Sequence, residues 1–241
     1  MPDALVEQLA GLGALVEPAR RDLFLYVAAQ SDAVSREQAA TAVGLPLHTV
    51  KFHLDRLVDE GLLDVEFRRL SGRTGPGAGR PSKLYRRSAR QLSVSLPERR
   101  YDLAGDVLAS AVERSIGTDV PVAEAVREVA RQKGLGLAMK SETGSRARTR
   151  RRSKRGRAGA VRHDLERTAV VLADHGFEPR VAERELCLAN CPFDRLAAEH
   201  TELVCGLNLA LIEGVVEGLG SDAVSAELAP QEGFCCVKVR G

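Results

Sequence analysis

The sequence predicts an α+β protein with an N-terminal winged helix-turn-helix, a helical middle segment and a small C-terminal α+β domain carrying clustered cysteines. Three observations lead to this prediction. Two helical patterns joined by a short glycine-containing turn precede a basic hairpin pattern within residues 1–90. Apolar residues then recur at helical spacing over residues 97–140. Finally, all 5 cysteines follow residue 186, where helix and strand patterns alternate.

The composition is that of an ordinary globular chain. Of its 241 residues, 44% are hydrophobic and 28% are charged, which is usual for such chains. Trp is absent and aromatic residues make up 4%, so we expect a core of Leu, Val and Ala instead of a large β-sandwich. Apolar runs are short, so no membrane span is expected. The first residues lack the features of a signal peptide, so we expect a cytoplasmic protein with reduced thiols.

Positive charge is concentrated in two segments, although the net charge is only +2. Residues 146–157 carry 8 basic residues and no acid, and residues 67–97 also contain no acid. Such concentration indicates a polyanionic partner. For residues 146–157 alone, a solvated and disordered linker is the simpler interpretation.

Residues 20–61 contain the helix-turn-helix pattern. The first helix is expected over residues 20–30, after Pro18. Ser35 and Gln38 predict a capping box for the next helix. Gly44 is suited to the left-handed residue of a tight turn, and a third helix is expected between Pro46 and residue 61.

The third helix has the features of a DNA-recognition helix, whose N-terminal residues contact base edges in the major groove. Its apolar face, expected to be buried, consists of Val50, Leu54, Leu57 and Val58. The candidate DNA contacts on the other side are His48, Thr49, Phe52 and Arg56, with Lys51 on the flank. Contact with a thymine methyl and burial in the core are both open for Phe52. His53 is expected to be a packed core histidine.

A basic wing is expected after this helix. Strand patterns over residues 62–70 and 83–87 flank a segment rich in Gly and Pro. Arg73, Arg80 and Lys83 would contact phosphates or the minor groove. The alternative is a helical bundle with an isolated hairpin.

The middle and C-terminal elements are predicted from their periodicity. Two helices are expected over residues 97–140, the second loosened by Gly134 and Gly136, and they either pair two subunits or pack within the chain. A further helix is expected to end at residue 176, followed by a strand pair or one bent strand. A long apolar helix broken near His200 and two final strands complete the domain.

The spacing of the cysteines is compatible with a metal site, but it is not an ordinary motif. Four thiolates suit zinc or an iron–sulfur cluster, yet no C-x2-C pair occurs. If residues 235 and 236 lie in a strand, only one of these two cysteines can face the site. His175 and His200 are possible nitrogen ligands, although surface positions are the simpler interpretation. Buried free thiols and direct thiol oxidation are the alternatives to metal binding.

The segments "TVKFHLDRLVDEGLL" and "RRLSGRTGPGAGRPSKLYRRS" resemble winged-helix regulators of the ArsR and DeoR types. The resemblance is greatest to the SufR-like branch of iron–sulfur regulators; it covers residues 19–90 and resumes in the C-terminal part. There "NCPF", "LVCGLN" and a cysteine near the end are similar to the cluster-binding pattern of that branch. The resemblance implies that Cys191, Cys205 and one of Cys235 or Cys236 bind an iron–sulfur cluster. Cys187 lies outside the pattern and is a less certain ligand.

Four segments are therefore expected: a DNA-binding domain (1–96), a helical segment that is a candidate for dimerisation (97–140), a basic flexible linker (141–158) and a cysteine-bearing sensor domain (159–241). The predicted function is that of a homodimeric transcriptional regulator that binds double-stranded DNA and senses iron or redox state. The alternative is a winged-helix regulator that responds to a small apolar ligand or a partner protein, with structural zinc or no metal. No phosphate loop, paired-carboxylate motif or nucleophile elbow occurs, so we do not expect an enzyme.

Overall fold

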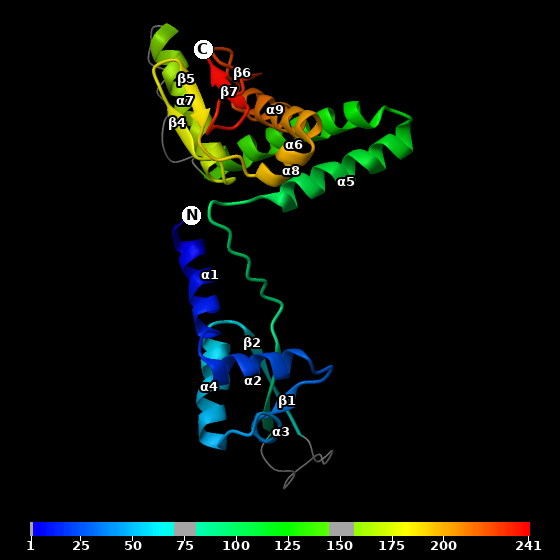
Figure 1. Ribbon diagram of the computed structural model, residues 1–241, viewed down its shortest axis with the longest axis vertical. Coiled ribbons are helices and arrows are strands. Elements are labelled where there is room, and N and C mark those ends of the chain that lie inside the picture. Colours follow the sequence, from blue (N-terminus) through cyan, green and yellow to red (C-terminus); the bar gives the residue numbers. More distant parts are fainter. Residues whose placement is uncertain (1, 70–80, 145–156) are drawn as a thin grey trace. The chain divides into compact units, whose positions relative to one another are not determined.

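The computed structural model describes residues 2–69, 81–144 and 157–241, and it divides the chain into two compact units (Figure 1). Unit 1 is Met1–Val94 and unit 2 is Ser95–Gly241. The expected helical segment 97–140 thus belongs to the same unit as the cysteines. Arg73, Arg80 and most of the expected linker lie outside the described residues.

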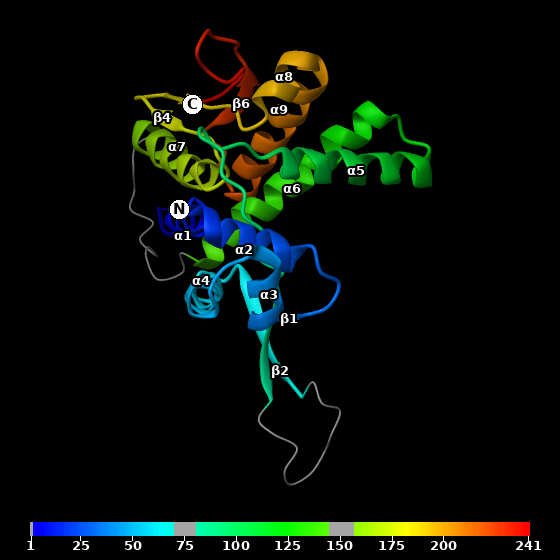
Figure 2. The same cartoon turned by 60° about the horizontal axis from the view of Figure 1, so that its bottom comes forward.

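Unit 1 combines four helices and three strands among its described residues. These are α1 (Pro2–Ala14), α2 (Pro18–Ala28), β1 (Val34–Ser35), α3 (Arg36–Val43), α4 (Leu47–Asp59), β2 (Leu63–Arg68) and β3 (Ser82–Arg87). Helices α2, α3 and α4 pack on one another around Leu23, Val50 and Leu54, which are fully buried. Figure 2 shows the β2–β3 hairpin extending away from these three helices.

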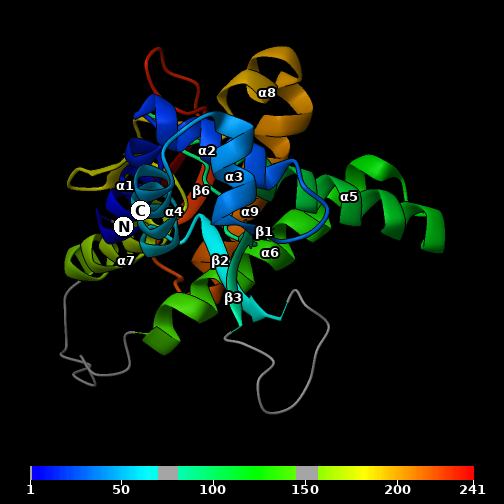
Figure 3. The same cartoon turned by 90° about the horizontal axis from the view of Figure 1, so that it is seen from below.

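The sheet of unit 1 has the strand order β1-β3-β2 among the described strands, with antiparallel neighbours. Strands β2 and β3 confirm the two strand patterns of the expected wing. The sequence did not predict β1, which pairs Val34 with Tyr85 and Ser35 with Leu84. Two residues are too short for an alternating pattern to be recognised. Figure 3 shows these strands beside α4.

Unit 2 contains five helices and four strands among its described residues. The helices are α5 (Tyr101–Thr118), α6 (Val122–Gly144), α7 (Arg157–Ala173), α8 (Asp194–Glu199) and α9 (Thr201–Gly218). The strands are β4 (Pro179–Val181), β5 (Glu185–Leu188), β6 (Ser225–Leu228) and β7 (Val237–Arg240). This confirms the α+β fold class, the strand pair and the helix break at His200, where φ is −132°.

The described strands of unit 2 form an antiparallel sheet in the order β4-β5-β7-β6. Leu186, Leu188, Val237 and Val239 are fully buried and belong to the core shared with α7 and α9. Because side chains alternate along a strand, Glu185 and Cys187 point to the other face of β5.

Helices α6 and α9 lie side by side at unusually short range (Figure 1). A Cβ atom added at Gly134 would lie 2.0 Å from the carbonyl oxygen of Leu211, and one at Gly214 would lie 2.1 Å from that of Arg131. The expectation that Gly134 and Gly136 loosen α6 is therefore wrong, since α6 is continuous through both. Gly134 is instead a contact residue, where only a hydrogen fits between two helices.

Two expectations about the middle of the chain are refined by these elements. Helix α5 packs on α6 within the chain and buries Leu103, Val107 and Ala111, whereas Val112 is exposed. Helix α6 extends to Gly144 and α7 begins at Arg157, so both ends of the expected linker 141–158 are helical. No Pro or Gly interrupts α6 between Gly136 and Gly144.

Within the described part of the chain, no helix is both long and apolar enough to cross a membrane.

Candidate functional site

The turn between α3 and α4 is defined by local chemistry that the sequence predicted. The Ser35 hydroxyl accepts a hydrogen bond from the Gln38 amide, and the Gln38 side chain accepts one from the Ser35 amide, which confirms the capping box. Gly44 adopts φ +72°, a left-handed conformation that costs glycine little. Helix α4 then starts after Pro46 and buries Val50, Leu54 and Leu57.

The outward face of α4 carries the predicted DNA contacts. His48, Lys51 and Arg56 are exposed, while Thr49 is half-buried. Phe52 is 64% exposed, so of its two interpretations the core position is excluded. Arg56 is paired with Glu60 one turn later, at 2.5 Å. The other exposed side chains leave a mixed basic and aromatic surface.

His53 is packed inside unit 1, as expected. It is 8% exposed, and its Nε2 lies 3.6 Å from Glu17 Oε2. Arg20 Nε donates to His53 Nδ1 at 3.5 Å. These contacts join α4 to the start of α2 and keep His53 away from the outward face.

The wing is attached to α4 by a polar bracket that the sequence did not predict. Lys83 Nζ lies 2.5 Å from Asp55 Oδ1, and the Tyr85 hydroxyl donates to the same oxygen at 3.0 Å. Burial alone would raise the pKa of Asp55, but these two partners outweigh it and hold that pKa below its ordinary value. Lys83, predicted to contact phosphate, is therefore already paired with a carboxylate.

All five cysteines lie in unit 2, and four of their thiols are neighbours. Cys191 follows β5, Cys205 lies in α9, and Cys235 and Cys236 immediately precede β7. Cys205 and Cys235 are buried, and Cys191 and Cys236 are half-buried against the same core. Cys235 interacts with both Cys191 and Cys236, and Cys205 interacts with Cys236.

These interactions separate the pKa values of the four thiols. Interaction with Cys235 lowers the pKa of Cys191, and it lowers that of Cys236 to about 6. Burial, together with the contact with Cys236, raises the pKa of Cys205 to about 12. The pKa of Cys235 is raised because this thiol interacts with Cys191 and Cys236 and is deeply buried.

Cys235 and Cys236 do not lie in a strand, so the condition under which only one of them could face the site does not hold. Strand β7 begins at Val237, and the two cysteines form a bend before it. Strand alternation therefore does not separate their side chains. Both interact with the other thiols.

Asn208 contacts this thiol group from inside α9. It is 1% exposed, and its Nδ2 donates to Cys235 Sγ at 3.1 Å. Its Oδ1 atom has no hydrogen-bond partner among the described residues. The available signal was one amide in the apolar run "LVCGLNLALI", three residues after Cys205. Buried amide groups normally have hydrogen-bond partners, so Asn208 Oδ1 is an acceptor that could bind a further donor beside the thiol group.

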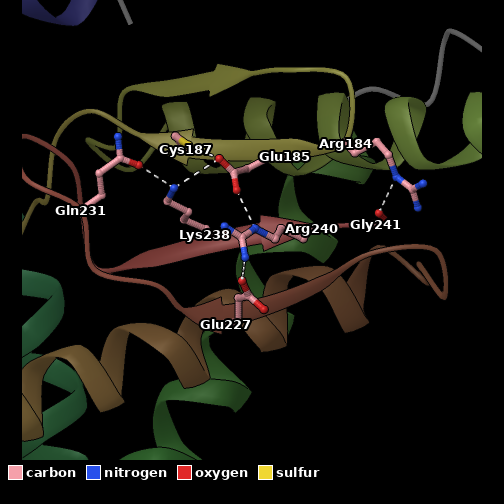
Figure 4. Close-up of polar contacts among 8 residues, drawn as sticks. All are labelled: Arg184, Glu185, Cys187, Glu227, Gln231, Lys238, Arg240 and Gly241. Atoms are coloured by element: carbon pink, nitrogen blue, oxygen red, sulfur yellow. Dashed lines mark hydrogen bonds and ion pairs between the residues drawn. The ribbon is translucent and has the colours of Figure 1, made fainter.

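Cys187 belongs to a set of polar contacts around Glu185 in the sheet of unit 2 (Figure 4). Its Sγ donates to Glu185 Oε1 at 3.0 Å, and Glu185 also pairs with Lys238 and Arg240. These partners, Cys187 first and then Arg240, lower the pKa of Glu185 to about 2. Leu186 and Leu188 on either side of Cys187 face the core against which the other thiols pack, so strand alternation directs Cys187 to the opposite face of β5.

Four thiols are suitable ligands for a metal or a cluster, but their side chains do not surround a single metal position in this structure. Four thiols from three segments are neighbours, whereas the described residues include no group of three or more His, Cys, Asp or Glu side chains already arranged around one metal position. His175 Nδ1 lies 2.8 Å from the Val171 carbonyl oxygen, and His200 is exposed.

Comparison with known proteins identifies the class of the N-terminal unit. A family model described as a helix-turn-helix domain matches residues 15–66, which span α2 to β2. The match supports a DNA-binding regulator and does not extend to the thiol-bearing unit. The other comparisons found no matching curated protein and no matching solved structure.

Proposed function

We propose that this chain is a homodimeric, sequence-specific transcriptional regulator whose thiol group binds an iron–sulfur cluster and reports iron or redox state. The observation that carries the proposal is the gathering of Cys191, Cys205, Cys235 and Cys236 in a chain that also contains a helix-turn-helix domain. A protein that acts on DNA works where the DNA is, so we propose a cytoplasmic location.

Helix α4 is the proposed reading element. His48 and Phe52 are exposed toward its N-terminal half, the part of a recognition helix that contacts base edges, and Lys51, exposed on the flank, would contact a phosphate. Arg56 would exchange Glu60 for a phosphate. Two copies of the chain would bind half-sites about 34 Å apart, because one recognition helix covers too little DNA for high specificity.

The four neighbouring thiols are the proposed ligands of the cluster. When bound, the cluster supplies a redox-active group whose presence depends on iron and on thiolate ligands. Asn208 already donates to Cys235 Sγ, and hydrogen bonds to ligand sulfur tune such groups. Because the described side chains do not surround one metal position, cluster binding would require the cysteine side chains to move.

The direct test is anaerobic purification followed by a visible absorption spectrum and assays of iron, sulfide and zinc. We expect broad visible absorption with iron and sulfide in near-equal amounts. Cys191→Ser and Cys236→Ser should each lose most of the iron. Cys187→Ser is the matched control and should retain it, because Cys187 pairs with Glu185 on the other face of β5.

Two results would contradict the iron–sulfur proposal. A colourless protein with one zinc per chain would make the thiol group a structural zinc site. A colourless protein that retains neither metal after anaerobic reconstitution with iron and sulfide would leave a regulator controlled by a ligand or partner protein.

A further inference from the structure

The end of the connection between the two units is held onto the turn that carries Cys191. Unit 1 ends at Val94, and the described residues 88–100 between β3 and α5 form neither helix nor strand. Within unit 2, residues 98–100 contact residues 190–194 through both backbone and side chains. The Arg100 amide donates to the Pro192 carbonyl oxygen at 3.0 Å.

Arg99 makes the largest share of these contacts. Its Nη1 donates to Asn190 Oδ1 at 2.5 Å and to the Cys191 carbonyl oxygen at 2.9 Å. Its Nη2 lies 3.3 Å from Asp194 Oδ2. The guanidinium group of Arg99 therefore contacts three residues of the turn. The Arg99 side chain is only 21% exposed.

Asn190 completes the attachment from inside the turn. It is 6% exposed, and its Nδ2 donates to the Glu98 carbonyl oxygen at 2.9 Å and to that of Gly176 at 2.6 Å. With Oδ1 accepting from Arg99, each polar atom of the side chain has a partner. Gly176 has φ +82° and lies so close to residues 98 and 100 that an added Cβ would be 3.2 Å from Glu98 Cγ.

The contacts that Arg99 and Asn190 make between residues 98–100 and residues 190–194 form a clamp. Cys191 belongs both to this clamp and to the thiol group. Its carbonyl oxygen is held by Arg99, while its thiol interacts with Cys235. A change in the bonding of Cys191 Sγ therefore acts on the backbone to which Arg99 is attached. A ligand shifts a conformational equilibrium only through contacts that differ between the two states, and this turn provides such contacts.

We propose that Arg99 and Asn190 are positioning residues that couple the bonding state of Cys191 to residues 95–100, the segment that leaves the helix-turn-helix unit. This inference rests on the proposed function, because it supplies a path by which the thiol group controls DNA binding. Neither Arg99 nor Asn190 is proposed to contact a thiol or DNA. They transmit a change in the turn to the connecting segment.

The first experiment tests the clamp in the full-length, reduced and metal-free protein by hydrogen–deuterium exchange and mass spectrometry. Arg99→Met removes three contacts with the turn. Arg100→Met is the matched control, because the Arg100 side chain pairs with Asp102 and Glu98 whereas its amide still reaches Pro192. We expect exchange in peptides covering 98–104 and 190–196 to rise about tenfold in Arg99→Met and to change little in Arg100→Met. Equal exchange in the two variants would overturn the clamp.

The second experiment tests the coupling, and iron and sulfide assays show whether a cluster forms. After reconstitution, we expect exchange over residues 95–104 to change at least about threefold in the wild type and in Arg100→Met, and to stay constant in Arg99→Met. If no iron is retained, the iron–sulfur proposal fails on its own. Alkylation of Cys191 with iodoacetamide, verified by mass, then serves as the perturbation, with the same expected pattern. A wild type whose exchange is unchanged although Cys191 is bonded or alkylated would overturn the coupling.

Discussion

Replacing Gly134 by Ala should destabilise unit 2, although the same change normally stabilises a helix. An added Cβ would lie 2.0 Å from the Leu211 carbonyl oxygen and 2.9 Å from the Val215 nitrogen. Ordinary contact begins near 3.4 Å, so α9 would have to move away by about 1.4 Å. Both atoms belong to helix backbone and cannot rotate aside. Overpacking of this kind typically costs about 1–3 kcal/mol, and we expect the upper end of that range or more.

Gly136→Ala is the matched control on the same helix. An added Cβ there meets no heavy atom within 4 Å, so the lower conformational entropy of Ala should stabilise α6 by about 0.5–1 kcal/mol. The two variants should therefore differ in the free energy of unfolding by roughly 3 kcal/mol. Urea unfolding followed by far-ultraviolet circular dichroism measures this difference, since the chain has no Trp. Equal stability of the two variants would refute the close approach of α6 and α9.

Three further predictions concern the DNA-binding unit and the outer face of the sheet in unit 2. Asp55→Ala should cost about 1–2 kcal/mol, because it leaves the Tyr85 hydroxyl without its acceptor, whereas Asp59→Ala, at an exposed position of the same helix, should cost little; urea unfolding compares them. Lys51→Ala should weaken DNA binding across sequences and reduce the salt slope by about 1, measured by fluorescence anisotropy, and an unchanged slope would exclude a phosphate contact. Glu185 has its pKa lowered from 4.5 to about 2 by Cys187 and Arg240, so its stabilising contribution is present above about pH 4.5 and is lost as the pH falls toward 2; Glu185→Gln should flatten the pH dependence of the urea midpoint in that window, and an unaltered profile would exclude this carboxylate as its source.

The helix-turn-helix could be predicted because its signals are local. The capping box of Ser35 and Gln38 and the left-handed Gly44 each act within a few residues. The packing of His53 was expected as well, and the structure adds its contacts with Glu17 and Arg20 at the start of α2, whereas the sequence left open whether Phe52 is exposed. The bracket on Asp55 joins residues about thirty positions apart, so no local pattern indicates it.

The thiol group could be predicted only in part. The clustering of the cysteines in the sequence indicated a site, and Asn208 was visible as one polar residue in an apolar helix. The sequence left open which of Cys235 and Cys236 faces the site if both lie in a strand, and it did not indicate that the strand begins only at Val237, after both cysteines. Gly134 illustrates the same limit: glycine weakens an isolated helix, but at a helix contact it allows an approach that any side chain would prevent.

The claim that the thiol group controls DNA binding is tested most directly by the affinity for operator DNA with and without the cluster. The operator would first be selected from random duplexes, and Kd would then be measured anaerobically at one fixed salt concentration, with iron and sulfide assayed in the same samples. If the thiol group controls DNA binding, loaded and cluster-free protein should differ at least about tenfold in Kd. Equal affinities in samples that differ in bound iron would contradict it, and they would separate the helix-turn-helix domain from any control by the thiols.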